Sequence, residues 1–368
     1  MQRGNDSSGF MRACLIVVLC ALSSCGAADD AAESSPERLP TSSLEDGGLD
    51  RAYWDAALRD LEDRRLPIDA MLLVHRGAVV AEYYAPGHAR RSLHDLRSAT
   101  KSITSMLVGA ATDRGMLDLQ ASVESFFPEQ SAHPSWRDYQ PMRVGDLLTM
   151  SSGLDCDDWA ASPGNEERMY LSADWLDFFF AIPAKREPGE RFSYCTSGVV
   201  TLGEIVSRVA GRSLPELAEA WLFEPLGITD AEWAEAPHGV TDSGGHLRLS
   251  VESLAKLGLL MHGGGVYAGK RLLSASYVEA SLTPSTWIFS PDQGPQYGYL
   301  WWLEPVRDGV AHSYQARGNG GQYIIALPAF DALVVFTGHA YNQPPEISQA
   351  PFDLTQRFVV PMLEQPAR

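Results

Sequence analysis

Segments with strand-like patterns lie at both ends of the globular part of this chain, and helix-like segments lie between them. The stretch "AMLLVHRGAVVAEYYA" predicts two strands around a tight turn at Arg76-Gly77. The stretches "YGYLWWLE", "QYIIALPAF" and "ALVVFTGHA" predict strands near the C-terminus, whereas residues 142–262 are mainly helical in pattern. Strands at the two ends of a domain join most simply in one sheet. The sequence therefore predicts an α+β fold, with an antiparallel sheet flanked by helices and a mainly helical lobe.

Further stretches have the apolar spacing of helices. "LDRAYWDAALRDLED" has apolar residues at helical intervals, and an amphipathic helix is predicted from Ile347. "SITSMLVGAATDRGML" is apolar on nearly all sides, which is typical of a buried helix. The aromatic residues 178–180 and the pair Trp301-Trp302 are interpreted as core residues, with an apolar wall for an acyl group as the alternative.

The N-terminus has the pattern of an export signal. Arg12 precedes the apolar run "ACLIVVLCAL", which is too short to cross a bilayer because a span takes about 20 apolar residues. The next letters complete "LSSC", which resembles the bacterial lipobox and implies cleavage before Cys25 and lipidation of its thiol. The alternative is an ordinary cleaved signal followed by a coincidental cysteine.

Three parts are expected along the chain: a lipoprotein-type signal peptide (1–24), a flexible acidic tether (25–48) and one globular domain (49–368). The tether is rich in Ala, Ser, Pro and acids and has no apolar period, so it cannot bury enough surface to fold. We expect an exported protein, anchored to a membrane by lipid and facing the periplasm or the cell exterior. The formal charge of -18 repels polyanions and argues against nucleic acid as a partner.

The pattern S-x-x-K occurs first at Ser98 and Lys101, where the polar stretch "RRSLHDLR" gives way to the apolar "ITSMLVGAA". A serine at the start of a buried helix has an unpaired backbone N–H, and the helix dipole favours negative charge beside it. A lysine one turn later lies on the same face. Burial removes its hydration and favours a neutral amine, which can accept the proton of Ser98. The alternative is an N-cap serine followed by a solvated lysine.

The same pattern recurs at Ser253 and Lys256, but its surroundings point to helix capping. Ser250 is predicted as the N-cap of this helix, which places Ser253 at the third helical position, where it bonds back to the cap. Lys256 is predicted to lie on the polar side of an amphipathic helix. Ser98 is therefore the better candidate for a nucleophile.

Other common catalytic motifs are missing from the sequence. It contains no G-x-S-x-G, no H-E-x-x-H, no paired C-x-x-C and no phosphate-binding glycine loop between a strand and a helix. We therefore expect no metal and no cofactor, and we interpret His88 and His94 as loop residues rather than ligands.

The segment around Ser98, "SATKSITSMLVGAATDRGML", resembles the first motif of the serine β-lactamase-related hydrolases. That family includes class C β-lactamases, D-Ala-D-Ala carboxypeptidases, esterases and 6-aminohexanoate-oligomer hydrolases. Five later stretches resemble its further motifs in the same order: "DLLTMSSGLD", "PGERFSYCTSGVVTLGEIVSRVAG", "LRLSVESLAKLGLLMHGGG", "YGYLWWL" and "GNGGQYIIALP". The resemblance covers residues 70 to 340 and implies a β-lactamase/transpeptidase-like fold for the domain 49–368.

The resemblance also implies roles for individual residues. Ser98 would be the acylated nucleophile, Lys101 its proton-transfer partner and Tyr194 the second base. The positive charge of Lys101 would lower the pKa of the Tyr194 phenol. The implied reaction is hydrolysis of a small ester or amide through an acyl-enzyme on Ser98.

Two departures from the family pattern affect the substrate. Thr196 stands where the family often has Asn, and the Lys-Thr-Gly motif is replaced by a loop that begins at Arg317. A backbone N–H of this loop, together with that of Ser98, would form the oxyanion hole, and which amide serves is left open. Without the motif lysine, only Arg317 could hold a β-lactam carboxylate, so another ester or amide is favoured. The implied substrate and oxyanion residues are Ser98, Thr196, Gly318, Asn319, Gly320 and Gly321.

Two cysteines remain outside the signal and anchor region, which holds Cys14, Cys20 and Cys25. In an exported protein Cys156 and Cys195 permit one disulfide, with two unpaired buried thiols as the alternative. The resemblance places both beside the active site, which favours the disulfide and would brace the neighbouring Tyr194.

The sequence also allows two other functions. One is a D,D-peptidase or β-lactamase that acts on cell-wall-like amides. The other is a catalytically silent, lipid-anchored binding protein. The presence of Ser98, Lys101 and Tyr194 together favours an enzyme.

Overall fold

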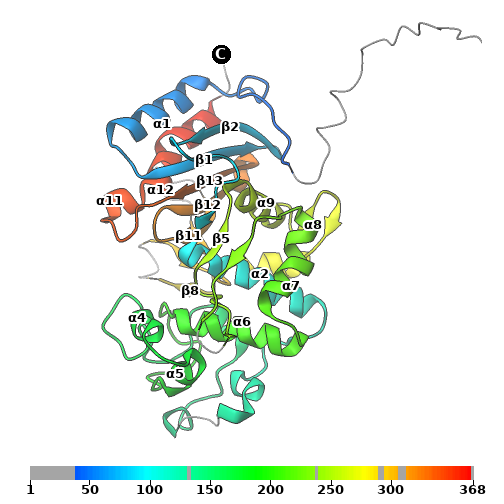
Figure 1. The fold of residues 1–368 in the computed structure, drawn as a ribbon, viewed down its shortest axis with the longest axis vertical. Coiled ribbons are helices and arrows are strands. Elements are labelled where there is room, and N and C mark those ends of the chain that lie inside the picture. The colour runs from blue at the N-terminus through cyan, green and yellow to red at the C-terminus, as the bar shows by residue number, and fades with distance from the viewer. Residues whose placement is uncertain (1–37, 131–133, 237–238, 289–293, 306–311, 366–368) are drawn as a thin grey trace, which may run out of the picture. The chain divides into compact units, whose positions relative to one another are not determined.

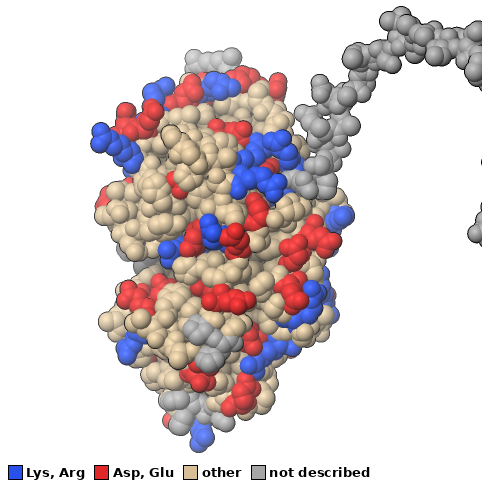
Figure 2. All heavy atoms as spheres, in the orientation of Figure 1, with Lys and Arg blue, Asp and Glu red and all other residues tan. Residues whose placement is uncertain are grey.

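The computed structural model describes residues 38–365, apart from 131–133, 237–238, 289–293 and 306–311. The expected signal peptide, the lipidated Cys25 and residues 25–37 of the expected tether lie outside the described residues. Residues 38–48 of the expected tether pack on the domain instead: Leu39 and Leu44 are buried, and the Ser42 N–H bonds to the Val79 carbonyl at 2.9 Å. The predicted boundary at residue 48 is therefore too late in the chain. Among the residues that are described, no helix is long and apolar enough to cross a membrane. Figure 2 shows acidic and basic side chains interspersed over the visible face of the described part.

One antiparallel sheet joins strands from both ends of the domain (Figure 1). This arrangement confirms the predicted α+β fold. The N-terminal hairpin pairs with the last strand through β1 and β13, whose register runs from Ile68–Gly338 to His75–Ala332. The strands in spatial order are β2 (Ala78–Tyr84), β1 (Ile68–His75), β13 (Ala332–Gly338), β12 (Gln322–Leu327), β11 (Ser313–Gly318), β10 (Trp302–Glu304), β9 (Gln296–Tyr297) and β8 (Thr286–Trp287).

Both faces of this sheet are covered, which explains why its central strands are continuous apolar runs. Alternate residues of β1 belong to different cores: Met71 and Leu73 pack with α1 (Arg51–Asp63), whereas Leu72 and Val74 pack on the opposite side. The core on the α1 side also includes residues of the C-terminal helices α12 (Ala350–Leu354) and α13 (Val360–Glu364) and of η8 (Thr355–Val359) between them. The short helix α11 (Pro345–Ser348) precedes them and has no buried residue.

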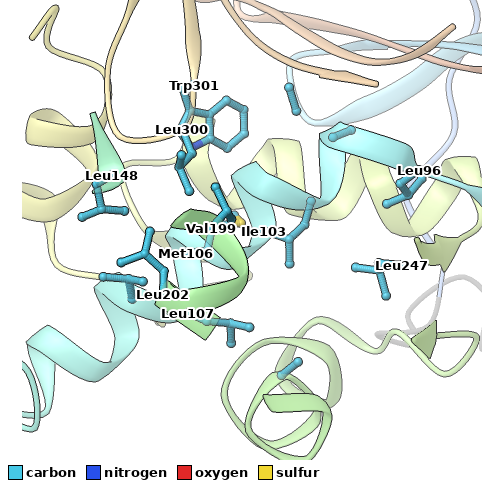
Figure 3. Packing of buried hydrophobic residues seen from close by; sticks show 14 of the residues in the cluster. Leu96, Ile103, Met106, Leu107, Leu148, Val199, Leu202, Leu247, Leu300 and Trp301 are labelled. Atoms are coloured by element: carbon cyan, nitrogen blue, oxygen red, sulfur yellow. The ribbon is translucent and has the colours of Figure 1, made fainter. Parts of the chain in front are cut away.

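The larger core surrounds helix α2 (Thr100–Asp113), in which every residue from Thr100 to Ala111 is buried. Figure 3 shows Met106 and Leu107 of α2 beside Val199 and Leu202 of α6. The helices of this lobe are α3 (Val144–Leu148), α4 (Glu166–Tyr170), α5 (Trp175–Ala181), α6 (Thr196–Ala210), α7 (Leu214–Ala218), α8 (Glu224–Leu226), α9 (Val251–His262) and α10 (Ala275–Ser281).

The remaining described elements are short. A second sheet has the order β3 (His94–Asp95), β5 (Leu247–Leu249) and β4 (Glu232–Trp233), and β6 (Val266–Tyr267) pairs with β7 (Lys270–Arg271). The other short helical segments are η1 (Arg97–Ala99), η2 (Val123–Phe126), η3 (Pro128–Gln130), η4 (Pro134–Trp136), η5 (Glu219–Phe223) and η7 (Pro328–Phe330).

The structure corrects two local predictions. The stretch "YGYLWWLE" forms two short strands rather than one, because the backbone folds back between them and the Gly298 N–H bonds to the Trp301 carbonyl at 3.0 Å. Ser250 is confirmed as the N-cap of α9, since its hydroxyl accepts the Ser253 N–H at 3.2 Å. Lys256, however, is buried rather than solvated, and its ammonium donates to the Gly227 carbonyl at 2.8 Å.

Candidate active site

Ser98 lies in the short turn η1, which leads directly into the buried helix α2. The preceding residue, Arg97, has a φ of 48°, a left-handed conformation that residues other than glycine adopt rarely. Asp95 holds this turn, because its carboxylate accepts the Arg97 N–H at 2.9 Å and lies 2.8 Å from Nδ1 of His246. Such strain is maintained only where neighbouring contacts impose it, and it is common at functional sites.

Lys101 turns its amine back toward Ser98 from the first turn of α2. Its Nζ lies 3.0 Å from Ser98 Oγ and 2.6 Å from the Gly244 carbonyl oxygen, and the residue is 1% exposed. Ala99, not Ser98, is the N-cap residue of α2. The alternative of an N-cap serine followed by a solvated lysine is therefore wrong.

Tyr194 reaches the same place from the segment that precedes α6. The Lys101 Nζ lies 5.1 Å from the centroid of the Tyr194 ring, and the ring is buried. Burial raises the pKa of the Tyr194 phenol, although the Lys101 charge and the Ser98 hydroxyl act to lower it. The predicted lowering of this pKa is therefore wrong, because loss of hydration outweighs the neighbouring charge. A phenol of this kind keeps its proton at neutral pH.

Two carboxylates that the sequence did not single out lie beside these residues and hold Thr196. The Thr196 N–H and hydroxyl lie 2.8 and 2.7 Å from Asp158 Oδ2, and the hydroxyl also lies 2.9 Å from Glu166 Oε2. One hydroxyl proton cannot serve two carboxylates, so this geometry favours a proton on one of them. Burial, reinforced by the charge of Glu166, raises the pKa of Asp158 to about 6. The Thr196 hydroxyl thus bonds to carboxylates, and no contact in the structure directs it to the oxyanion position.

A third carboxylate, Asp242, lies on the same side of the site as the Gly244 carbonyl. Asp242 is buried, and its Oδ1 has no hydrogen-bond partner among the described residues. Burial raises its pKa, while the charges of His246 and Lys101 lower it. The Lys101 charge therefore acts on two buried carboxylates, Asp158 and Asp242, that only the fold brings near it.

Aromatic rings form a wall beside Tyr194. Trp159 stacks on the Tyr194 ring at a centroid distance of 5.0 Å and is 53% exposed. Trp302 lies 6.1 Å from both rings, and Phe192 lies 5.8 Å from Trp159. Trp301, next in sequence, is fully buried, so the predicted core assignment fits Trp301 while Trp302 belongs to this wall.

The residues of the loop 317–321 contact two different parts of the structure. Gly318 packs against η1 so closely that a Cβ there would collide with the Leu96 carbonyl oxygen and lie 3.1 Å from the Ala99 nitrogen. Asn319 instead exchanges hydrogen bonds with Asn342 at 2.7 and 2.9 Å. The loop residues Gly320 and Gly321 lie near Tyr341 and Pro351 respectively. Of the predicted loop residues, Gly318 is thus the one placed directly against the turn that carries Ser98.

Cys156 and Cys195 form a disulfide with a Cα–Cα distance of 5.4 Å. Cys195 lies between Tyr194 and the N-terminus of α6, while Cys156 lies two residues before Asp158. The bond therefore joins the segment of the second proposed proton-transfer residue to the segment that carries a carboxylate of the site.

The sequence matches the protein family described as Beta-lactamase over residues 54–356. The chain belongs to this family. It is 28% identical over 300 residues to the 6-aminohexanoate-dimer hydrolase of Paenarthrobacter ureafaciens, a match that covers 76% of this chain and 74% of that enzyme. It is also 28% identical over 204 residues to the esterase EstB of Burkholderia gladioli, covering 50% of this chain and 51% of that one.

Solved structures agree with the family assignment at the level of fold. The octameric penicillin-binding protein homologue from Pyrococcus abyssi matches with a TM-score of 0.65 at 22% identity, covering 86% of this chain and 78% of that chain. A hydrolase with promiscuous acyltransferase activity matches with a TM-score of 0.68 at 16% identity, covering 85% of this chain and all of the other. The expected β-lactamase/transpeptidase-like fold and the expected enzyme class, a serine hydrolase of this family, are confirmed.

This member of the Beta-lactamase family has an arginine near the position of the missing motif lysine, but the arginine is already paired. Arg317 Nη2 lies 2.8 Å from the carboxylate of Glu304, which is buried, and its guanidinium lies 4.8 Å from the Trp302 centroid. Because Glu304 matches its charge, Arg317 is poorly suited to hold a substrate carboxylate.

Proposed function

We propose that this chain hydrolyses an uncharged ester or amide with an apolar acyl group, through an acyl-enzyme on Ser98. The observation that carries the proposal is the 3.0 Å approach of the buried Lys101 amine to the Ser98 hydroxyl, with Tyr194 beside both. A nucleophile within hydrogen-bond reach of its base, with a further group orienting the base, is the arrangement that acyl transfer requires.

In the proposed first step, Ser98 Oγ attacks the substrate carbonyl carbon and its proton passes to the Lys101 amine, a step that requires the unprotonated amine. The Gly244 carbonyl accepts an N–H of Lys101 at 2.6 Å, and this contact helps to hold the nitrogen 3.0 Å from Ser98 Oγ. The negative charge on the carbonyl oxygen would be bound by the Ser98 N–H and by an N–H from β11. The pairing of β11 with β10 ends at Gln315, so residues Ala316 to Gly318 extend past the end of β10 toward η1. The backbone N–H groups on that edge of β11 are therefore the candidates for binding the oxygen.

The tetrahedral intermediate then loses its alcohol or amine. Tyr194, whose raised pKa keeps the phenol protonated, donates a proton to the leaving oxygen or nitrogen and regains one from Lys101. In the second half, water attacks the acyl carbon and gives its proton to the same pair of residues. Breaking the bond to Ser98 Oγ returns a proton to the serine and releases the carboxylic acid.

The surroundings of Ser98 favour an uncharged, apolar acyl group. The wall of Trp159, Trp302 and Phe192 offers apolar contact, and the cation of Arg317 is matched by Glu304. Asp158 and Glu166 would repel a substrate carboxylate. The names of the relatives, a 6-aminohexanoate-dimer hydrolase and an esterase, are consistent with amide or ester bonds as the target.

A fluorophosphonate probe tests the nucleophile, because it labels only an activated serine. We expect labelling of the wild type and of Ser253→Ala, which removes the other S-x-x-K serine, and no labelling of Ser98→Ala. An unlabelled wild type would favour the catalytically silent binding protein.

Matched substrates test the specificity. We expect p-nitrophenyl butyrate to be cleaved with a higher kcat/KM than p-nitrophenyl hemisuccinate, which carries a carboxylate on an acyl chain of the same length, and nitrocefin to be cleaved slowly. Preference for nitrocefin or for a D-Ala-D-Ala peptide would favour the β-lactamase or D,D-peptidase alternative instead.

We also propose that the protein is exported with a signal peptide over residues 1–24 and anchored by a lipid on Cys25. The apolar run 13–22 followed by "LSSC" supports this proposal. In a bacterial host, labelled palmitate should enter the wild-type protein and not Cys25→Ala, and the mature wild type should partition into detergent. Equal labelling of both proteins would refute the anchor.

A further inference from the structure

A cluster of histidines around one aspartate lies outside the proposed catalytic groups. Asp69 is at the start of β1, His88 and His94 lie between β2 and α2, and His339 directly follows β13. We propose that Asp69, His88 and His94 bind one divalent transition-metal ion, best matched by Zn²⁺, with His339 as the fourth ligand. This proposal is independent of the proposed hydrolysis.

The distances between the donor atoms fit a metal centre. Asp69, His88 and His94 each offer one ligand atom, and these three atoms lie within 4.8 Å of one another. Nε2 of His94 lies 3.2 Å from one Asp69 oxygen, and Nε2 of His88 lies 3.4 Å from the other. Ligands of a tetrahedral zinc ion with bonds of about 2.0–2.2 Å are separated by roughly 3.4 Å. Nδ1 of His339 lies 2.7 Å from the same Asp69 oxygen as His88, close enough to turn toward a shared ion.

The buried nitrogen of His94 carries the strongest argument. Nδ1 of His94 lies 3.0 Å from the Ser92 carbonyl, which can only accept, so this nitrogen carries the ring proton. The other ring nitrogen, Nε2, faces the Asp69 carboxylate at 3.2 Å. Nε2 is buried and has no hydrogen-bond partner among the described residues. Nε2 is thus aimed at a carboxylate without a hydrogen bond to it, so a metal ion between the two atoms would satisfy both, and the Ser92 contact is the outer-shell bond typical of a zinc-bound histidine.

The exposure of the four side chains gives an ion a route from solvent. Asp69 and His94 are buried, whereas the side chains of His88 and His339 are 33% and 63% exposed. Nitrogen and carboxylate ligands in this number suit Zn²⁺ better than Mg²⁺ or Ca²⁺, which prefer oxygen. The two imidazole rings of His88 and His94 are stacked at 5.2 Å, so their side chains already lie side by side.

The position of the cluster indicates what such an ion would do. β1 and β13 are neighbouring strands of the large sheet (Figure 1), and His94 lies four residues before Ser98. A bound ion would therefore tie the sheet to the segment that leads into the nucleophile turn. It would act as a brace for that segment, because its ligands are separate from Ser98, Lys101 and Tyr194.

A search of the sequence for closely spaced metal ligands could not find this proposed zinc site. Asp69 and His339 are 270 residues apart in the chain, so the cluster has no zinc motif in its sequence. The interpretation as loop residues is correct for His88 but not for His94, which begins the short strand β3, and it did not anticipate that both side chains converge on Asp69.

Metal analysis of the full chain, expressed without a histidine tag, tests the proposal. After chelation and titration with ZnCl₂, we expect one Zn²⁺ per chain, and the Co²⁺-loaded protein should show the visible absorption of a four-coordinate site. The Tm should rise with Zn²⁺ and not with Mg²⁺.

Variants locate the ion. His94→Ala should weaken Zn²⁺ binding by roughly 100-fold or more, because even outer-shell partners of a zinc ligand are worth about 10–100-fold. His88→Gln, at a half-exposed position that tolerates change, provides a second test in case His94→Ala fails to fold. His262→Ala is the control, since its imidazole pairs with Asp331 elsewhere. Absence of bound Zn²⁺ in the wild type, or equal affinity in His88→Gln and His262→Ala, would overturn the proposal.

Discussion

The Lys101 amine lies 3.0 Å from the Ser98 hydroxyl and 2.6 Å from the Gly244 carbonyl, so one buried nitrogen contacts both the proposed nucleophile and a loop 143 residues away. The first contact follows from one turn of helix. The second depends on the fold, and it determines which way the amine points.

Lys101→Met should reduce kcat/KM for p-nitrophenyl butyrate by about 10²–10⁴, the usual contribution of a general base. The apolar side chain fills the volume of the lysine stem but cannot accept the Ser98 proton. Fluorophosphonate labelling should slow in parallel. Lys185→Met is the control, because Lys185 is exposed and its amine pairs with Asp155 rather than with Ser98. Equal rates in the two variants would remove Lys101 from the mechanism.

Tyr194→Phe should affect poor leaving groups more than good ones. The phenol is expected to protonate the departing oxygen or nitrogen, and p-nitrophenolate departs without a proton, whereas an alkoxide does not. Ethyl butyrate hydrolysis should therefore fall by about tenfold or more beyond the loss seen with p-nitrophenyl butyrate. A loss of the same size for both esters would show that Tyr194 acts elsewhere than on the leaving group.

Asp158→Asn should flatten the dependence of stability on pH. The pKa of Asp158 is raised to about 6, so the folded state favours the protonated carboxyl. Its stabilising effect is complete below the ordinary value near 3.8 and is lost as the pH rises through about 6. The difference between these values corresponds to about 3 kcal/mol at most.

Urea unfolding at pH 4.5 and pH 7.5 checks this prediction. The free energy of unfolding of Asp158→Asn should fall less between the two pH values than that of the wild type, because an amide keeps an acceptor for the Thr196 N–H without a buried charge. Asp138→Asn changes an exposed carboxylate and should behave as the wild type does. An Asp158→Asn profile that parallels the wild type would contradict the assignment.

Removal of the disulfide should lower both stability and activity. Cys156 and Cys195 are 39 residues apart, and closing a loop of that length stabilises a protein by about 3–4 kcal/mol in the chain-entropy account. Cys156→Ala/Cys195→Ala should therefore unfold at lower urea concentration. Its kcat should also fall, since the bond holds the segments of Tyr194 and Asp158 together. An unchanged kcat would mean that other contacts suffice to position Tyr194.

The parts of this protein that depend on neighbours in sequence could be predicted from the sequence alone. The hairpin β1–β2 and the buried helix α2 follow from apolar spacing, and Ser98 and Lys101 meet because three residues make nearly one helical turn. The order of six motifs was enough to indicate the family and to bring Tyr194 to the same site.

Which groups surround these residues could be learned only from the tertiary structure. Asp158 and Glu166 meet at Thr196, Arg317 is matched by Glu304, and Asp69 gathers three histidines, all through contacts between distant segments. The direction of the Tyr194 pKa shift and the burial of Lys256 were misjudged for the same reason. Desolvation depends on everything packed around a group, and that packing is a property of the whole fold rather than of any local stretch of sequence.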